Sequence, residues 1–327
     1  MGAAAPIWWH RRGMLSRCLA LALGFALRCL LAGVSLLGAG QALAASACPP
    51  PLPGVQATAP ARDRGLLWRI TQGGHSSWLF GTLHVGKPDW QRFGPRLTAA
   101  LQASDELALE IDPNDPALRA ALAETVPPPE LAPPLQARLQ QAYERACVAS
   151  ESMATLHPVL QAATLTVLEA RWLGMDPSFA MEQLLLAHLR GRHVVSLETA
   201  AQQKAALVPD DPAEALAQLD QSLAQLEDRS GRRVLARMAQ AWERGDLAAL
   251  EDYDRWCECA SNDDDRAFMR RLNDERNPAL ADGIAARHRL GKRVFAAVGA
   301  LHMTGPQSLP RLLAQRGFQV ERIRWAR

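Results

Sequence analysis

The chain has 327 residues, of which 48% are hydrophobic and 21% charged, a composition typical of globular proteins with a substantial core. The formal net charge is +2, but residues 1–44 carry four arginines and no acid, so the rest of the chain has a charge of −2. This balance, without a basic stripe, argues against nucleic acid as a partner.

Residues 1–44 have the order of a secretory signal. A basic head with Arg11-Arg12 precedes an apolar run over residues 18–37, and Ala42-Leu43-Ala44 supplies the small residues of a cleavage site. We therefore expect residues 1–44 to be removed and the protein to be periplasmic or secreted, with twin-arginine export as one route. A membrane anchor is the alternative. No later stretch is apolar for long enough to span a bilayer.

A Pro/Ala-rich leader over residues 45–62 is expected to lie outside the fold. Beyond the signal, the cysteines are Cys48, Cys147, Cys257 and Cys259. An even number in an oxidising compartment predicts disulfides, and four cysteines allow three pairings. Half of a metal site at Cys257 and Cys259 is the alternative, but no His or Cys lies nearby to complete the usual spacing.

Short β-type runs occur at both ends of the remaining chain. Residues 66–71 and 78–80 surround Gly73-Gly74 and predict a hairpin. Apolar runs predict further buried strands. They occupy residues 107–111, 194–197 and 293–298. A helix over residues 309–315, stopped by Gly317, precedes an alternating final strand over residues 318–323.

Between these ends the periodicity is mainly helical, from about residue 135 to 290. Leucines at three- and four-residue steps share one helix face. They are Leu216, Leu219, Leu223 and Leu226. We therefore predict a single α/β domain over residues 63–327, in which the N- and C-terminal segments form a central mixed β-sheet and the middle is a large helical insertion.

Two Gly-x-x-His motifs follow predicted strands, Gly81-Thr82-Leu83-His84 and Gly299-Ala300-Leu301-His302. Glycine lets the chain leave a strand through backbone angles closed to other residues. Each His then lies just beyond a strand end, where open α/β sheets bind their ligands. Neutral imidazole is a common metal ligand, so the pair predicts a shared metal site. Two structural histidines capping strand ends are the alternative.

Glu110 lies within an apolar strand-like run, and Glu198 directly follows another. An unpaired carboxylate is costly to bury, so each is expected to meet a cation or to emerge from the core. With His84 and His302 they could hold a hard or borderline cation and leave a position for water. Salt bridges, with Arg276 as a partner, are the alternative.

The other histidines beyond the signal have no such context. Four are expected at the surface or in packing, and His288, between two arginines, is expected in solvent. The four are His75, His157, His188 and His193. Acidic runs at residues 251–254 and 263–265 lack the Gly and distal Glu of an EF-hand loop, so we interpret them as solvated helix ends.

The sequence resembles the TraB/GumN family, which includes the Tiki proteins. The likeness rests on blocks that run in the family's order and cover nearly the whole chain after the signal. They are Leu67-Trp68-Arg69-Ile70, Trp78 to Gly86, Leu109-Glu110-Ile111-Asp112, Leu197-Glu198-Thr199, Arg276-Asn277 and Val298 to Gly305. The resemblance implies a fold related to the erythromycin-esterase and ChaN-like group, with both Gly-x-x-His motifs at the active centre.

Residue by residue, the resemblance assigns roles. His84 and His302 match the family's ligands, Glu110 and Glu198 match its acids, and Arg276-Asn277 matches its paired polar block. Tiki members are described as metal-dependent proteases that favour manganese or cobalt-like ions. They are tethered to membranes, whereas this chain has only its leader, so the resemblance does not identify the substrate.

The sequence thus favours a periplasmic or secreted metal-dependent hydrolase, and the resemblance suggests a peptidase. His84, His302 and one carboxylate, Glu110 among the candidates, would hold a divalent metal such as manganese, a cobalt-like ion or zinc. A carboxylate, for which Glu110 is the first choice, would act as general base, and Arg276 would stabilise an oxyanion or bind a substrate carboxylate.

Two alternatives remain. The first is a non-catalytic envelope protein that binds a peptide, polysaccharide or haem-like ligand on the same surface. The second is a purely structural envelope protein. Metal content and cleavage of a peptide library, with and without a chelator, distinguish the three hypotheses.

Overall fold

The computed structural model describes residues 48–54, 60–123, 130–189, 191–257 and 262–325. The predicted signal over residues 1–44 lies outside the described residues. The described chain is a mixed α/β fold with one sheet and long helical segments inserted between its strands, as the sequence predicts.

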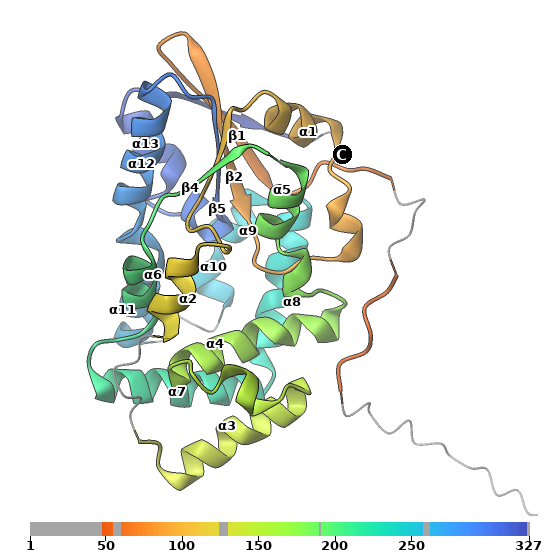
Figure 1. The fold of residues 1–327 in the computed structure, drawn as a ribbon, viewed down its shortest axis with the longest axis vertical. Coiled ribbons are helices and arrows are strands. Elements are labelled where there is room, and N and C mark those ends of the chain that lie inside the picture. Colours follow the sequence, from red (N-terminus) through yellow and green to blue (C-terminus); the bar gives the residue numbers. More distant parts are fainter. Residues whose placement is uncertain (1–47, 55–59, 124–129, 190, 258–261, 326–327) are drawn as a thin grey trace, which may run out of the picture. The chain divides into compact units, whose positions relative to one another are not determined.

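One six-stranded sheet organises the fold, in the order β4-β3-β5-β2-β1-β6 (Figure 1). Its strands are β1 Leu66–Gln72, β2 His75–Thr82, β3 Glu106–Leu109, β4 His193–Ser196, β5 Val294–Gly299 and β6 Gln319–Ile323. Strands β4, β3, β5 and β2 run parallel to one another. Strand β1 pairs antiparallel with both β2 and β6. The sheet is therefore mixed, and the predicted hairpin is β1–β2.

Helices fill the chain between the strands. The α-helices are α1 Pro95–Gln102, α2 Pro116–Ala123, α3 Pro133–Ala146, α4 Pro158–Leu168, α5 Met181–His188, α6 Ala200–Leu207, α7 Pro212–Glu227, α8 Ser230–Glu243, α9 Leu247–Glu251, α10 Tyr253–Trp256, α11 Asp263–Met269, α12 Asn277–Arg289 and α13 Leu309–Gln315. Short 3-10 helices are η1 Pro88–Gln91, η2 Ser150–Met153, η3 Glu169–Leu173, η4 Pro177–Phe179 and η6 Ala300–Met303; η5, Arg270–Asp274, is a π-helix. Because β4 lies within the helical region, the predicted insertion is divided in two.

Two apolar cores hold these elements together. The larger one surrounds the sheet, where β5 is buried from Val294 to Val298. The smaller one joins α3, α4 and α7, which lie away from the sheet in Figure 1. Within it, Leu219, Leu223 and Leu226 are buried on one face of α7, as their spacing predicts.

The strand register brings the predicted site residues to one edge of the sheet. Thr82 at the end of β2 pairs with Gly299 at the end of β5. Leu109 at the end of β3 pairs with Ala297 on one side and Ser196 on the other. The chain segments that leave these parallel strands therefore start side by side, at the carboxyl end where open α/β sheets bind ligands.

A disulfide joins Cys48 to Cys147, with a distance of 5.6 Å between their Cα atoms. It fastens the Pro/Ala-rich leader to the residue that caps α3. Cys257 is also disulfide-bonded, while Cys259 lies outside the described residues. Disulfides are typical of oxidising compartments. Among the helices in the described ranges, none is long and apolar enough to cross a membrane.

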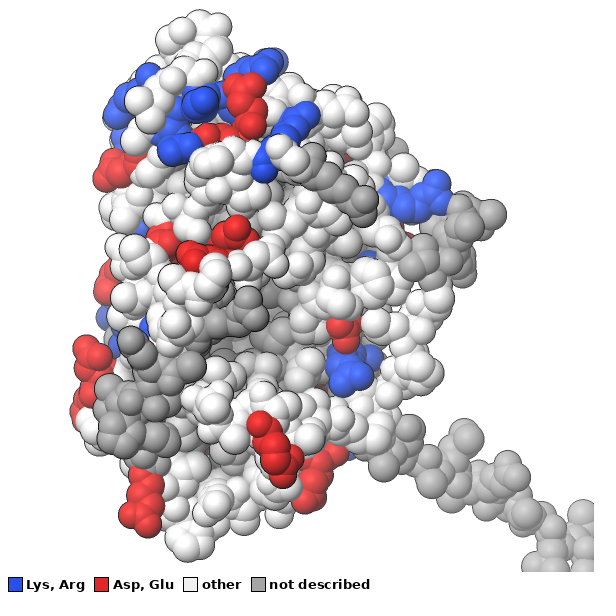
Figure 2. All heavy atoms as spheres, in the orientation of Figure 1, with Lys and Arg blue, Asp and Glu red and all other residues white. Residues whose placement is uncertain are grey.

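Charged side chains are unevenly spread over the face drawn in Figure 2. Lysine and arginine gather at the end of the molecule where α12 and α13 lie in Figure 1, with acidic side chains among them. One ion pair links these two helices, because Arg316 Nε lies 2.7 Å from Asp282 Oδ1. Exposed pairs of this kind contribute little to stability.

His288 is buried, with 1% of its surface exposed, so the prediction that it lies in solvent is wrong. Its ring stacks on His75 with ring centroids 3.8 Å apart. Ser77 Oγ accepts a hydrogen bond from Val294 N and lies 2.8 Å from His288 Nδ1, to which it donates. His288 Nε2 then donates to Gln72 O at 3.0 Å. The flanking arginines misled the interpretation, because α12 turns this one position toward the hairpin.

Burial lowers the pKa of His288, and the bond to Gln72 O opposes this only in part. The unfolded chain therefore binds more protons at this residue than the folded chain does, so stability falls as the pH drops through about 6.5, the ordinary value for His. We expect the unfolding free energy of His288→Gln to fall less than that of the wild-type protein between pH 7.5 and 5.5. The two slopes should differ by up to about 1.4 kcal/mol per pH unit. Urea denaturation at both pH values measures it, with His193→Gln as the exposed control. An unchanged slope in His288→Gln would contradict the prediction.

Candidate functional site

Five of the predicted site residues form one connected network at the carboxyl edge of the sheet. They are Glu110, Glu198, Arg276, Asn277 and His302. Three different strands and one helix supply them, because Glu110 follows β3, Glu198 follows β4, His302 follows β5, and Arg276 caps α12. A hydrogen bond from Glu198 N to Glu110 O, at 2.9 Å, holds the first two segments together.

Arg276 is the centre of this network. Its Nε donates to Glu198 Oε1 at 2.9 Å, and its Nη2 donates to Glu198 Oε2 and to Glu110 Oε2, each at 2.5 Å. Its Nη1 donates to Leu272 O at 2.9 Å and lies 3.4 Å from His302 Nε2. A guanidinium has five N–H donors, and these contacts engage all of them. The structure thus has the salt bridges that the sequence left as an alternative.

Charge compensation keeps this buried network ionised. Burial alone would lower the pKa of Arg276, but the hydrogen bonds that it donates to Glu198 and the charges of both carboxylates hold it above its usual value. Burial alone would raise the pKa of Glu110, but His302, Arg276 and His84 lower it to about 2. Glu110 is therefore a fixed anion at the end of β3.

The backbone of the second Gly-x-x-His motif holds the other oxygen of Glu110. Gly299 N donates to Glu110 Oε1 at 2.7 Å. A Cβ added at Gly299 would lie 3.2 Å from this oxygen and 3.4 Å from His302 Cδ2. At Gly81 an added Cβ would lie 3.2 Å from the Cα of Ala300. Neither glycine has a positive φ, so the predicted conformational reason for them is wrong, and close packing takes its place.

His302 is buried, and its tautomer follows from its neighbours. Its Nδ1 lies 2.6 Å from Asn277 Oδ1. Asn277 Nδ2 donates to Gln307 O at 2.9 Å, which fixes the orientation of the amide. His302 Nδ1 therefore carries the proton, and its Nε2 has a lone pair 3.8 Å from Glu110 Oε1. Burial lowers the pKa of His302 to about 4, so the ring is neutral at neutral pH.

His84 lies at the surface and pairs with a residue that the sequence did not indicate. Its side chain is 67% exposed, and its Nδ1 lies 3.3 Å from Glu182 Oε1. The charge of Glu182 raises the pKa of His84 to about 9. A hydrogen bond from Met181 N to Leu83 O, at 3.0 Å, holds the start of α5 beside the motif. Glu182 Oε2 is buried and has no hydrogen-bond partner among the described residues.

The two histidines lie within reach of each other's charge. The charge of His84 contributes to the lowered pKa of His302, and Glu110 and Arg276 both act on the pKa of His84. In the described part of the chain, no three His, Cys, Asp or Glu side chains are grouped closely enough to hold a metal ion. The site therefore combines the His84–Glu182 pair with a neutral His302, whose Nε2 lies 3.8 Å from Glu110 Oε1.

Sequence reasoning missed Glu182 because nothing local distinguishes it. An acidic residue in the first turn of a helix is an ordinary feature that favours the helix dipole. Only the contact between α5 and the segment after β2 brings it to His84. A second feature that the sequence did not reveal is a π-helix, η5, which ends just before Arg276. π-Helical segments are rare in proteins overall, and those that occur are often at functional sites.

Residues 66–322 match the model of the TraB/PrgY/gumN family. The chain belongs to this family. Among curated proteins, the uncharacterized protein YbaP of Escherichia coli strain K12 is 27% identical over 277 residues, which cover 76% of this chain and 96% of the relative. The protein of the same name from Shigella flexneri matches to the same extent. No solved structure matches the chain. Family membership confirms the resemblance, and the relatives' names assign no activity.

Proposed function

We propose that this TraB/PrgY/gumN protein is an exported, metal-dependent hydrolase in which His84 and His302 hold a divalent cation. One observation carries the proposal. Each ring has its Nδ1 beside an oxygen acceptor, Glu182 for His84 and Asn277 for His302, so Nε2 is the atom that would face a cation. Binding would displace the Nε2 proton of His84, whose pKa is about 9, and the Arg276 contact on His302. Metal-binding histidines almost always have their other ring nitrogen held in this way.

The donor set suits a cation in two further respects. His302 is neutral at neutral pH, which is the state in which imidazole binds metals. Glu182 Oε2 is a buried carboxylate oxygen without a donor among the described residues. Arg276 Nη1, which lies 3.4 Å from His302 Nε2, opposes a cation there, so its contact would have to give way on binding.

We assign Glu110 as the carboxylate ligand, because its low pKa keeps it anionic. A bound manganese, cobalt-like or zinc ion would supply a water that ionises near neutral pH. We assign Glu182 as the proton acceptor on its geometry, since Glu110, with a pKa of about 2, is a weak base. Both oxygens of Glu110 already accept hydrogen bonds, whereas Oε2 of Glu182 is open.

Arg276 and Glu198 fit positioning roles. The N–H groups of Arg276 are all engaged, so an oxyanion role would require one of its contacts to break. Glu198 accepts from Arg276 through both oxygens. The pair instead holds Glu110 at the strand end.

Export and a peptide substrate complete the proposal. The disulfide between Cys48 and Cys147 supports an oxidising compartment, in agreement with the signal predicted over residues 1–44. A peptide substrate follows the resemblance to the Tiki proteins.

The test uses the full chain, expressed with its signal and purified from the periplasm. Mass spectrometry of metal content is expected to find on the order of one transition-metal ion per chain, and peptide-library cleavage is expected to stop with a chelator and return with manganese. Bound metal without any cleavage would instead favour a binding protein. Protein that neither takes up nor responds to manganese, cobalt or zinc would refute the metal centre.

A further inference from the structure

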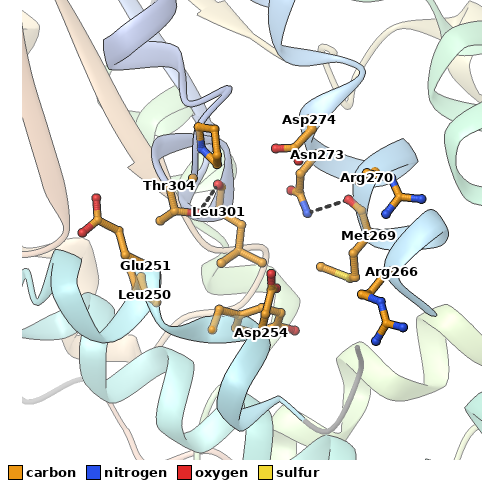
Figure 3. Close-up of a pocket in the computed structure, with 13 residues that line it drawn as sticks. Leu250, Glu251, Asp254, Arg266, Met269, Arg270, Asn273, Asp274, Leu301 and Thr304 are labelled. Atoms are coloured by element: carbon orange, nitrogen blue, oxygen red, sulfur yellow. Dashed lines mark hydrogen bonds between the residues drawn. The ribbon is translucent and has the colours of Figure 1, made fainter. Parts of the chain in front are cut away.

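A small open pocket lies beside the site, lined by α9, α10, α11, η5, η6 and the residues that follow η6 (Figure 3). Its volume is about 180 Å³. Ligand pockets for whole small molecules typically have about 300–1,000 Å³, so this one suits a single side chain. Its lining adjoins two residues of the site along the chain, because Leu301 in its wall precedes His302 and Asp274 at its rim closely precedes Arg276.

The pocket has apolar walls. Leu250 comes from α9, Met269 from the end of α11, and Leu301 from η6. In Figure 3 the side chain of Met269 extends toward Leu301 across the pocket. Pro306 completes the apolar lining. Such walls suit a hydrocarbon chain.

Two carboxylates face this apolar space from different elements. Asp254 of α10 points into the pocket in Figure 3. Asp274 of η5 faces η6, since its Oδ1 lies 3.9 Å from where a Cβ on Gly305 would be. Burial and the charge of Asp254 raise the pKa of Asp274. Neither carboxylate has a hydrogen-bond or ion-pair partner among the described residues.

Basic residues also line the pocket, but they do not neutralise it. The guanidinium groups of Arg266 and Arg270 point away from the pocket in Figure 3. Arg266 Nη2 binds Asp263 Oδ1 at 2.5 Å. The charge of Arg270 acts on Asp274, but the pKa of Asp274 remains raised. The interior thus combines apolar walls with an excess of negative charge.

We propose that this pocket binds the side chain of a lysine or arginine in a peptide substrate. The aliphatic stem would lie against Leu250, Met269 and Leu301, and the cationic group between Asp254 and Asp274. Lysine and arginine have this division between an apolar stem and a charged head, and a cation between carboxylates makes strong, charge-assisted hydrogen bonds. The inference rests on the proposed function, because it names the substrate class of the same site.

Met269 provides a direct readout of binding that needs no turnover. Full-length protein with labelled methionine methyl groups is titrated with acetyl-Gly-Lys-Gly-amide, and the Met269 resonance is assigned with Met269→Leu. We expect a saturable shift of this resonance. Acetyl-Gly-norleucine-Gly-amide, which has a similar stem without the charge, is expected to bind at least tenfold more weakly.

Two neutralising variants and one matched control test the carboxylates. Asp254→Asn and Asp274→Asn are each expected to weaken binding of the lysine peptide about tenfold, since each removes one charge-assisted contact. Glu251→Gln removes the same charge from the pocket's lining, but this carboxylate points away from the pocket in Figure 3, so binding should be unchanged. Equal binding of both peptides, or equal loss in all three variants, would overturn the proposal.

The experiment separates this inference from the proposed function. If the protein cleaves no peptide but Met269 still reports selective binding of the lysine peptide, the hydrolase fails and the pocket stands. If the protein cleaves peptides with the same kcat/KM for lysine and norleucine and Met269 does not respond, the pocket fails and the hydrolase stands. His84→Ala should leave the Met269 response intact in either case.

Discussion

Replacing His84 with alanine is expected to lower the affinity for manganese or zinc by at least about a hundredfold, because changes to groups that merely support a ligand already cost 10–100-fold. Turnover of a cleaved peptide should fall with it. The fold should be unaffected, since this side chain is 67% exposed and its recorded polar contact is with Glu182. Isothermal titration with the metal, alongside thermal melting, measures both effects.

His193 offers a closely matched control. Its side chain is 69% exposed, and its Nδ1 lies 3.9 Å from Glu106 Oε2. It therefore shares exposure and a neighbouring carboxylate with His84, but it lies at the start of β4, at the other end of the strands. His193→Ala should bind metal as the wild-type protein does. If His84→Ala binds it equally well, His84 is not a ligand and the proposed centre is wrong.

Much of the fold could be predicted from the sequence because buried strands have a strong local signature. Strands buried on both faces appear as continuous apolar runs, and β5 is such a strand. Gly73-Gly74 marks the hairpin, and both of these glycines have a positive φ. The helix predicted over residues 309–315 is α13 with the same bounds. In these cases neighbouring residues determine the structure.

The contacts of the site could be predicted only in part, because they depend on tertiary packing. The periodicity placed Glu110 and Glu198 at strand ends, and Arg276 was among the partners considered for them. The sequence could not show that one guanidinium binds both carboxylates. It also gave no reason to choose Glu182, which reaches His84 only because α5 packs beside the segment after β2.

His288 and Gly299 show two further limits. The arginines around His288 suggested solvent, but which face of α12 meets the hairpin is a property of the packed molecule. Gly299 was identified as important for its backbone freedom, whereas its φ is −47° and the restriction is the space beside Glu110. A motif can therefore identify the right residue while its physical reason lies in contacts that no motif contains.

Arg276→Met is expected to cost about 3–5 kcal/mol of unfolding free energy, because removing one member of a buried ion pair leaves uncompensated charge in the interior. The side chains of Arg276, Glu110 and Glu198 are 13%, 10% and 4% exposed. Methionine keeps much of the volume but donates no hydrogen bond, so both carboxylates lose their charged donor. Urea denaturation at neutral pH measures the change.

The same substitution at an exposed pair gives the control. Arg293 binds Asp105 with side-chain exposures of 53% and 36%, and exposed pairs of this kind contribute little to stability. Arg293→Met should therefore cost far less than Arg276→Met. Adding Glu198→Gln to Arg276→Met should restore part of the loss, since it removes one of the two buried charges left behind. Equal costs at the two arginines, or no gain from Glu198→Gln, would mean that water reaches these carboxylates, and Arg276 would then be free to meet a substrate.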